Sequence, residues 1–205
     1  MKNRIMFIAL AALVLSAFAS AATLADGPVE GRSGRAELRY MEGMIDHHQM
    51  AVDMANDCLT KASSEDLKTI CQNIIDAQTG EIAQLQDWLL DWYNVQYAPV
   101  PMMAEDDGMG GMDHGGMEGM PHTDPPMMMG MMAGLNRVEG VEYDIAWAES
   151  MIDHHDDAIH MSERLLSRIP EGEGHADLRA LAEKIIEDQT AEIEMLESQI
   201  AAWSA

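Results

Sequence analysis

The sequence is poor in cysteine, in aromatic residues and in positive charge. It contains two cysteines, and phenylalanine, tyrosine and tryptophan together make up 5% of its residues. Its 12 Lys and Arg residues stand against 36 Asp and Glu residues, which gives a formal net charge of -24 at pH 7. Such an acidic surface repels nucleic acids and anionic lipids, so we exclude both as partners. It attracts cations, including metal ions, although acidic surfaces also keep proteins soluble at high salt.

The common motifs of covalent and metal-dependent catalysis are also missing. The sequence has no Gly-rich phosphate loop, no Ser nucleophile elbow and no His-Glu-x-x-His zinc motif. It lacks the Glu-x-x-His motifs that di-iron carboxylate bundles use. We therefore expect a protein that is not an enzyme.

The N-terminus has the pattern of a secretory signal peptide. Lys2 and Arg4 precede an apolar run over residues 5–18, and Ala19-Ser20-Ala21 then provides a small-x-small cleavage site, with residues 23–25 as a second candidate. The run is shorter than the ~20 residues that a membrane span needs, although an uncleaved anchor is the alternative. No other segment could cross a membrane. We predict export to the bacterial periplasm or secretion, with no membrane insertion after cleavage.

An internal repeat organises the rest of the chain. The segment Met44-Ile45-Asp46-His47-His48 recurs as Met151-Ile152-Asp153-His154-His155. Downstream, residues 74–85 and 185–196 share the pattern Ile-Ile-x-x-Gln-x-x-Glu-Ile-x-x-Leu. The two offsets, 107 and 111 residues, differ by four residues, which fall near the turn-like Pro and Gly residues of 170–174. Each repeat is therefore predicted to contain two helices joined by a turn.

Two amphipathic hairpins bury their apolar stripes by packing together, which predicts an all-α protein with a four-helix bundle. We expect helices over residues 37–59, 64–93, 141–167 and 176–203, the second one capped at Ser63-Ser64-Glu65-Asp66. The long connection allows a crossover that makes the second and third helices parallel, but a simple up-down-up-down bundle stays open. The predicted organisation is a signal peptide (1–21), a mature N-terminal segment (22–36), a first hairpin (37–97), a linker rich in Met, Gly and His (98–137) and a second hairpin (138–205), the two hairpins forming one bundle domain.

Paired histidines lie on the predicted core-facing stripes of the first and third helices. At 100° per residue, one stripe contains Met44, His47, His48, Ala51, Met54, Ala55 and Cys58, and the other contains Met151, His154, His155, Ala158, Met161, Ser162 and Leu165. The second and fourth helices bring Gln78, Glu81, Gln189 and Glu192 to their inner faces. Buried polar groups need partners, and the histidines of the facing helices are the obvious ones. These residues form either a hydrogen-bond network that fixes helix register or a set of metal ligands.

The predicted linker holds many of the 20 methionines, interleaved with Gly, Asp and His rather than with Leu or Ile. Thioether sulfur is a soft, uncharged donor that suits Cu(I) and Ag(I), and imidazole extends the choice to Cu(II). A flexible chain with this spacing can wrap an ion with three or four ligands. The alternatives are low-complexity drift and a Met-rich contact surface. The candidate ligands of the linker are Met109, Met112, His114, Met117, Met120 and His122.

The two cysteines are placed to meet across the turn of the first hairpin. Cys58 ends the first predicted helix and Cys71 lies near the start of the second, both on the inner face. Export permits a disulfide, which is our main interpretation, with copper thiolate ligation as the second. His160 and His175 are isolated in the sequence, and we expect both at the surface, where His160 could add to a site at Met161.

The doubled Met-Ile-Asp-His-His motif, followed in each half by Gln-x-x-Glu-Ile, resembles the DUF305 family over residues 37–203. This resemblance implies a ferritin-like four-helix core with a His-His motif in each half, and a periplasmic copper-binding protein of the copper-resistance type. Family members often carry Pro before the His pair, where this chain has Asp46 and Asp153. Carried over position by position, the resemblance implies ligands at His47, His48, Met54, His154, His155 and Met161.

Together these patterns predict a periplasmic protein that binds copper, Cu(I) first, with Ag(I) as a mimic and Cu(II) through imidazole. It would serve sequestration, relay or resistance, with another periplasmic copper carrier or an efflux component as its partner. Met44 and Met151 complete the candidate ligands on the helices. One alternative is a ferritin-like metal oxidase that uses the core histidines with Glu81 and Glu192. The other is a structural or interaction bundle without a metal function.

Overall fold

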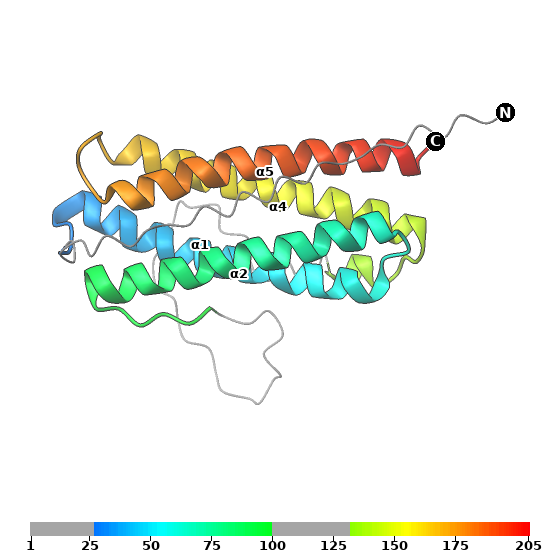
Figure 1. Cartoon of the computed structure of the whole chain (residues 1–205), viewed down its shortest axis with the longest axis horizontal. Coiled ribbons are helices and arrows are strands. Elements are labelled where there is room, and N and C mark those ends of the chain that lie inside the picture. The colour runs from blue at the N-terminus through cyan, green and yellow to red at the C-terminus, as the bar shows by residue number, and fades with distance from the viewer. Residues whose placement is uncertain (1–26, 100–131) are drawn as a thin grey trace.

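The computed structural model describes residues 27–99 and 132–205, and within them it is a four-helix bundle without strands (Figure 1). The four long helices are α1 (Gly31–Lys61), α2 (Glu65–Tyr93), α4 (Val141–Arg168) and α5 (Ala176–Trp203). Helices α1 and α2 form one hairpin and α4 and α5 form the other, as the repeat predicts. No helix of the described residues combines the length and apolar character needed to span a membrane.

Helix α1 begins six residues earlier than the sequence predicts, at Gly31 instead of Glu37. Its first turn contains two glycines, which have low helix propensity and hide the start from sequence reasoning. Tertiary contacts stabilise this turn, because the Ser33 hydroxyl donates a hydrogen bond to Glu173 over 3.0 Å. A Cβ on Gly34 would come within 1.8 Å of the Val29 carbonyl oxygen, so this position requires glycine. Helix α2 starts as predicted, with the Ser64 side chain accepting from the Leu67 backbone N–H.

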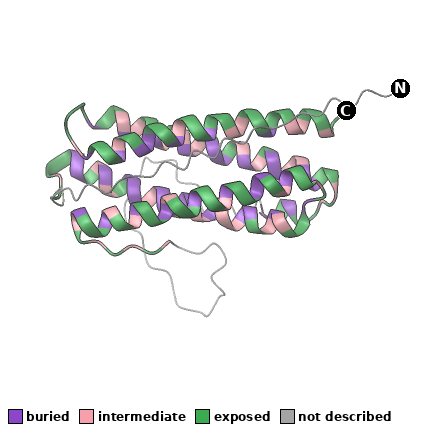
Figure 2. Ribbon diagram, in the orientation of Figure 1, coloured by how far each residue is buried: buried purple, intermediate pink, exposed green. Residues whose placement is uncertain are grey.

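Each helix turns a buried face toward the inside of the bundle and an exposed face outward (Figure 2). The apolar core has two parts. One contains Met54, Cys58, Ile74 and Trp147, and the other contains Tyr40, Met44, Leu85 and Ile185, among others. The paired histidines and the core-facing glutamines occupy the positions between the two parts along each helix. A polar layer therefore crosses the bundle near the middle of its length.

The two hairpins are joined so that α2 and α4 run parallel, which is the ferritin-like crossover. At one end, the carboxylate of Asp144, near the start of α4, accepts hydrogen bonds from the backbone N–H groups of Ser63 and Ser64 in the α1–α2 turn, over 2.9 and 3.0 Å. At the other end, the backbone N–H of His175, in the α4–α5 turn, donates to Glu37 near the start of α1. Helix α4 therefore starts where α2 starts, and Figure 1 shows the same direction for both.

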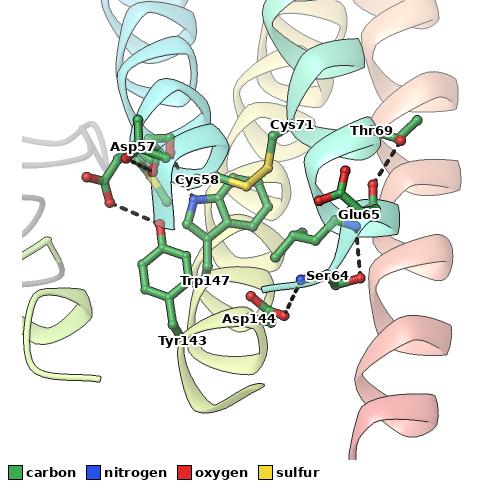
Figure 3. Close-up of a disulfide and its surroundings, with 12 residues drawn as sticks. Asp57, Cys58, Ser64, Glu65, Thr69, Cys71, Tyr143, Asp144 and Trp147 are labelled. Atoms are coloured by element: carbon green, nitrogen blue, oxygen red, sulfur yellow. Dashed lines mark hydrogen bonds between the residues drawn. A yellow bond between two sulfur atoms is a disulfide. The ribbon is translucent and has the colours of Figure 1, made fainter. Parts of the chain in front are cut away.

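A disulfide joins Cys58 to Cys71 across the first hairpin, with 6.4 Å between the Cα atoms, so the disulfide interpretation is confirmed (Figure 3). Trp147 of α4 packs in the same apolar cluster and donates its indole N–H to the Met54 carbonyl oxygen over 3.0 Å. Residues 132–135, at the end of the predicted linker, form a short helical turn, and Met132 is buried in this cluster. This end of the bundle is therefore fixed by both covalent and tertiary contacts.

Candidate metal centre

The four paired histidines come together at the centre of the polar layer, where α1 packs against α4. All four are buried, with at most 2% of each side chain exposed. The ring centroids of His47 and His154 lie 3.7 Å apart, and the Nε2 of His154 donates to the His47 carbonyl oxygen over 3.0 Å. These two histidines occupy equivalent positions in the repeat. Their contact means that an approximate two-fold axis passes between α1 and α4 at this point.

The outer histidine of each pair contacts a glutamate from the second helix of its own hairpin. The Nε2 of His48 lies 2.8 Å from Glu81 Oε2, and the Nε2 of His155 lies 2.7 Å from Glu192 Oε2. The first contact is a hydrogen bond, whereas the angle at the second falls outside hydrogen-bond geometry, so we treat it as a polar contact. The prediction that the core histidines face these glutamates is therefore confirmed.

The two core glutamines behave differently from the glutamates. Gln78 and Gln189 are 2% and 3% exposed. Within residues 27–99 and 132–205, neither polar atom of Gln78 has a hydrogen-bond partner, and neither does Oε1 of Gln189. The expected pairing of Gln78 with a histidine is therefore wrong, and the glutamates instead contact the Nε2 atoms of the outer rings.

Burial keeps the two central imidazoles neutral. Loss of water lowers the pKa of His47 well below its ordinary value, and the charges of His154, His48 and His155 lower it further. Burial likewise lowers the pKa of His154, helped by His155 and His48. Burial alone would raise the pKa of Glu81, but the hydrogen bond and charge of His48, with Lys184, outweigh burial and lower it. Neutral imidazole is the form that binds metals.

Several ring nitrogens of these histidines are available as ligands. Among the described residues, both nitrogens of His47 and the Nδ1 atoms of His48, His154 and His155 have no hydrogen-bond partner. Buried polar atoms without partners are rare in folded proteins and call for an explanation, such as an ion. No group of three or more His, Cys, Asp and Glu side chains of the described residues is arranged to hold a metal. A metal site in the core must therefore use donors of another type, or the imidazole rings must rotate when the metal binds.

Methionine thioethers are the other metal donors in the interior of the bundle. Met44 and Met151 each precede their His pair by three and four positions, which places them on the same helix face. Both are fully buried, as is Met54, whereas Met161 is only partly buried. The structure thus brings the predicted helix ligands into the interior except Met161. The predicted linker ligands, Met109, Met112, His114, Met117, Met120 and His122, lie outside the described residues.

A second buried polar cluster, which the sequence does not reveal, surrounds His175, and the prediction of His175 at the surface is wrong. This residue is 7% exposed instead of lying at the surface, and its ring stacks on Trp92 with 3.7 Å between centroids. Its Nδ1 lies 2.6 Å from Glu37 Oε2, and Tyr93 donates its hydroxyl to the same oxygen. The position of His175 just before α5 gave no periodic signal, so only the tertiary contact reveals its role. His160, by contrast, is exposed as predicted.

The chain matches a family model and resembles several solved structures. The family model described as "Domain of unknown function (DUF305)" matches residues 37–200. CopM in its Cu(II)-bound form has 29% sequence identity and a TM-score of 0.59, and the match covers 82% of this chain and 97% of that one. CopM in an Ag-bound form obtained by co-crystallization has 25% sequence identity and a TM-score of 0.60, and the match covers 82% of this chain and 98% of that one. A DUF305 protein from Streptomyces coelicolor has 21% identity, a TM-score of 0.60 and coverages of 83% and 93%, and this likeness supports the fold alone. Comparison with curated protein sequences gives no match.

Proposed function

The chain belongs to the DUF305 family, and from this premise we propose that it is a copper-binding protein, not an enzyme, that acts outside the cytoplasm after export. Its cargo is Cu(I), with Ag(I) as a mimic and with Cu(II) accepted through imidazole. It sequesters the ion or passes it to another copper carrier or an efflux component, and so contributes to copper resistance. The signal-peptide pattern of residues 1–21 supports export.

One observation carries this proposal: the interior holds four imidazoles, from matched positions of two repeats, and the fully buried thioethers of Met44 and Met151 on the same helix faces. The central rings of His47 and His154 are held neutral by burial. Neutral nitrogen and sulfur donors favour monovalent copper and silver over hard divalent ions. The CopM structures with Cu(II) and with Ag give independent support, since they share the fold at 29% and 25% identity.

The Met-rich segment has a separate role in the proposal. Residues 109–122 carry four methionines and two histidines at spacings of two or three positions. This segment would capture the ion, and the helix-borne donors would hold it in a more defined geometry. Uncharged ligands release a monovalent ion readily, because they add no charge attraction to the metal–ligand bonds. A carrier needs such exchange more than a permanent store does.

The direct test is an anaerobic Cu(I) titration of the mature chain against a competing chelator. We compare it with a variant lacking residues 102–131, which keeps the buried Met132, a Met44→Leu/Met151→Leu variant and a variant with the four paired histidines changed to Ala. Leu replaces a thioether by a hydrocarbon of similar volume, so the core stays packed. Met41→Leu is the matched control, since this fully buried methionine lies about two helical turns before His48.

The proposal expects the deletion to lower the number of ions bound, and the Met44→Leu/Met151→Leu and histidine variants to weaken the binding that remains. The control should match the parent chain. The histidine variant alone is a weak test if it fails to fold, and circular dichroism checks this point. If the deletion, Leu and histidine variants all bind Cu(I) as the parent does, the proposed ligands are wrong.

A metal oxidase is the second candidate, because each outer histidine contacts a glutamate, His48 with Glu81 and His155 with Glu192. Carboxylate and imidazole together are the donors of ferritin-like oxidases. This candidate requires repeated turnover, with oxygen consumed as Cu(I) or Fe(II) is oxidised. Stoichiometric binding without oxygen consumption favours the carrier, and Glu81→Gln/Glu192→Gln should then leave Cu(I) stoichiometry unchanged.

A further inference from the structure

Three of the four core histidines present their Nε2 atoms to oxygen atoms. The Nε2 of His48 lies 2.8 Å from Glu81 Oε2, and the Nε2 of His155 lies 2.7 Å from Glu192 Oε2. The Nε2 of His154 lies 3.0 Å from the carbonyl oxygen of His47. An ionised carboxylate and a backbone carbonyl only accept hydrogen bonds, and at these distances they repel a nitrogen lone pair. Each of these three Nε2 atoms therefore carries the proton.

The position of this proton decides which nitrogen of each ring can bind a metal. A neutral imidazole has one N–H group and one nitrogen with a free lone pair. With the proton on Nε2, the free lone pair is on Nδ1. The Nδ1 atoms of His48, His154 and His155 are buried and have no hydrogen-bond partner among the described residues. In each of the three rings, the nitrogen without a partner is thus the one that can bind a metal.

The two glutamates recur at matched positions of the repeat, Glu81 on α2 and Glu192 on α5. Their side chains are 13% and 23% exposed, whereas the side chains of His48 and His155 are fully buried. A glutamine of the same length can either donate to an imidazole or accept from it, so it would allow both tautomers. A carboxylate can only accept, so it allows one. Both hairpins therefore place at this position the side chain that fixes the tautomer of the outer histidine.

We propose that Glu81 and Glu192 are positioning residues of the copper site: each holds its histidine in the Nε2–H tautomer, so that His48 and His155 bind the metal through Nδ1. This inference rests on the proposed copper function, and it names the binding atoms and the residues that select them. A carboxylate that accepts from the remote N–H of an imidazole fixes the orientation of the ring and makes the other nitrogen a stronger metal donor.

The buried methionines agree with binding through Nδ1. Met44 precedes His48 by four positions, Met151 precedes His155 by four positions, and both thioethers are fully buried. Side chains four positions apart are neighbours on a helix, and the later one leans toward the earlier one. Nδ1 is bonded to Cγ, so it stays closer to its own helix than Nε2 does. Each repeat therefore offers one sulfur and one nitrogen donor from a single helix face.

The first measurement uses the metal-free mature chain with ¹⁵N-labelled histidine at about pH 8, above the ordinary titration range of histidine. Long-range ¹H–¹⁵N NMR correlations identify the protonated nitrogen of each ring, and His48, His154 and His155 should show the Nε2–H tautomer. The chain is then loaded with Ag(I). Metal binding moves the ¹⁵N signal of the bonded nitrogen, and the movement should occur at Nδ1 of His48 and His155.

The Glu81→Gln/Glu192→Gln variant tests the role of the carboxylates. It should populate the Nδ1–H tautomer at His48 and His155 and weaken Ag(I) binding about 10–100-fold, with the number of bound ions unchanged. Each single variant should change the tautomer only of the histidine in its own hairpin. Urea unfolding checks that the variants fold, and a purely structural role of the glutamates would change stability without changing the tautomers.

The control variant is Asp87→Asn/Glu187→Gln, which removes the same charge from exposed positions of α2 and α5 and should keep the tautomers and the Ag(I) affinity of the parent. Three results overturn the inference and leave the copper function in place: Nδ1–H tautomers in the parent, silver-induced movement at Nε2, or parent-like tautomers and affinity in the double Gln variant. A parent that retains no Ag(I) against a chelator refutes the copper function, and with it the role of the two glutamates.

Discussion

At the scale of single residues, burial decides what the histidines can do. His47 and His154 are enclosed by the two apolar halves of the core, and their pKa values are lowered mainly because water is excluded. These imidazoles stay neutral at pH values at which an exposed histidine begins to be protonated. The same exclusion of water leaves ring nitrogens without hydrogen-bond partners. These nitrogens lower the stability of the metal-free protein, and they are available to bind an ion.

The lowered pKa values predict how stability changes with pH. In the unfolded chain both histidines titrate near pH 6.5, and in the folded chain well below it. Above about pH 6.5 both states are neutral, and as pH falls further only the unfolded state gains protons. We expect the metal-free protein to lose about 3 kcal/mol of unfolding free energy between pH 7.5 and 5.5 from this pair.

Urea unfolding across this pH range measures the effect. His47→Gln/His154→Gln should show a shallower decline than the parent, whereas the exposed control His160→Gln should decline as the parent does. Parallel declines of the parent and the double Gln variant would mean that the central rings are not buried neutral groups.

Glu37 is the second residue whose environment gives a definite prediction. It is 1% exposed and accepts hydrogen bonds from the His175 backbone and from Tyr93. Glu37→Ala leaves these buried donors unpaired and opens a cavity, so it should lower the unfolding free energy by about 3–5 kcal/mol. Denaturant unfolding tests this, with the exposed Glu30→Ala as control. A loss below 1 kcal/mol would show that the cluster does not hold the helices together.

At the scale of elements, the two hairpins share a plan but differ in how each is closed. The first has the Cys58–Cys71 disulfide, and the second has Leu165 and Ala182 at the matching positions. The second hairpin instead relies on the contact of His175 and Glu37, which anchors its turn to α1. The two repeats therefore have equivalent helices, but a different contact stabilises the turn of each hairpin.

Removing the disulfide should lower stability without removing the copper site. Cys58→Ala/Cys71→Ala opens a loop with a sequence separation of 13 residues, and such a loop contributes about 2–4 kcal/mol. Chemical denaturation of the oxidised parent and the variant measures the difference, and far-ultraviolet circular dichroism should show unchanged helix content. Loss of most Cu(I) binding in the folded variant would restore the cysteines as candidate ligands.

The helices could be predicted because capping and apolar periodicity are local features of the sequence. The contacts that hold each hairpin closed could not be predicted, because they join residues distant in sequence. The starts of α2, α4 and α5 agree with the sequence to within one residue, as capping and apolar periodicity suggest. The start of α1 was placed late because Gly31 and Gly34 are poor helix formers that tertiary contacts override. The core histidines followed from the stripe pattern. The burial of His175 and the unpartnered state of Gln78 depend on neighbours distant in sequence, which periodicity does not reveal.

At the scale of the whole molecule, parallel α2 and α4 put equivalent residues of the repeats face to face. The end of α2 and the start of α4 therefore lie at opposite ends of the bundle (Figure 1). The approximate two-fold axis passes through the histidine pair and between α2 and α5, where Gln78 and Gln189 occupy matched positions of the polar layer.

The parallel arrangement predicts a long distance between the end of α2 and the start of α4. Spin labels at Leu90→Cys and Glu142→Cys, both exposed positions, should be about 35–40 Å apart, from the rise of 1.5 Å per helical residue. The control pair Glu65→Cys and Glu142→Cys should be much closer. Double electron–electron resonance measures both distances. A short distance for the first pair would establish an up-down-up-down bundle.

The central claim is that neutral sulfur and nitrogen donors bind a monovalent coinage metal. X-ray absorption at the copper edge of the mature chain, loaded anaerobically with Cu(I), tests it most directly. The account predicts a first shell of sulfur with some imidazole nitrogen. A shell made only of oxygen, or failure to retain Cu(I) against a chelator, would contradict it.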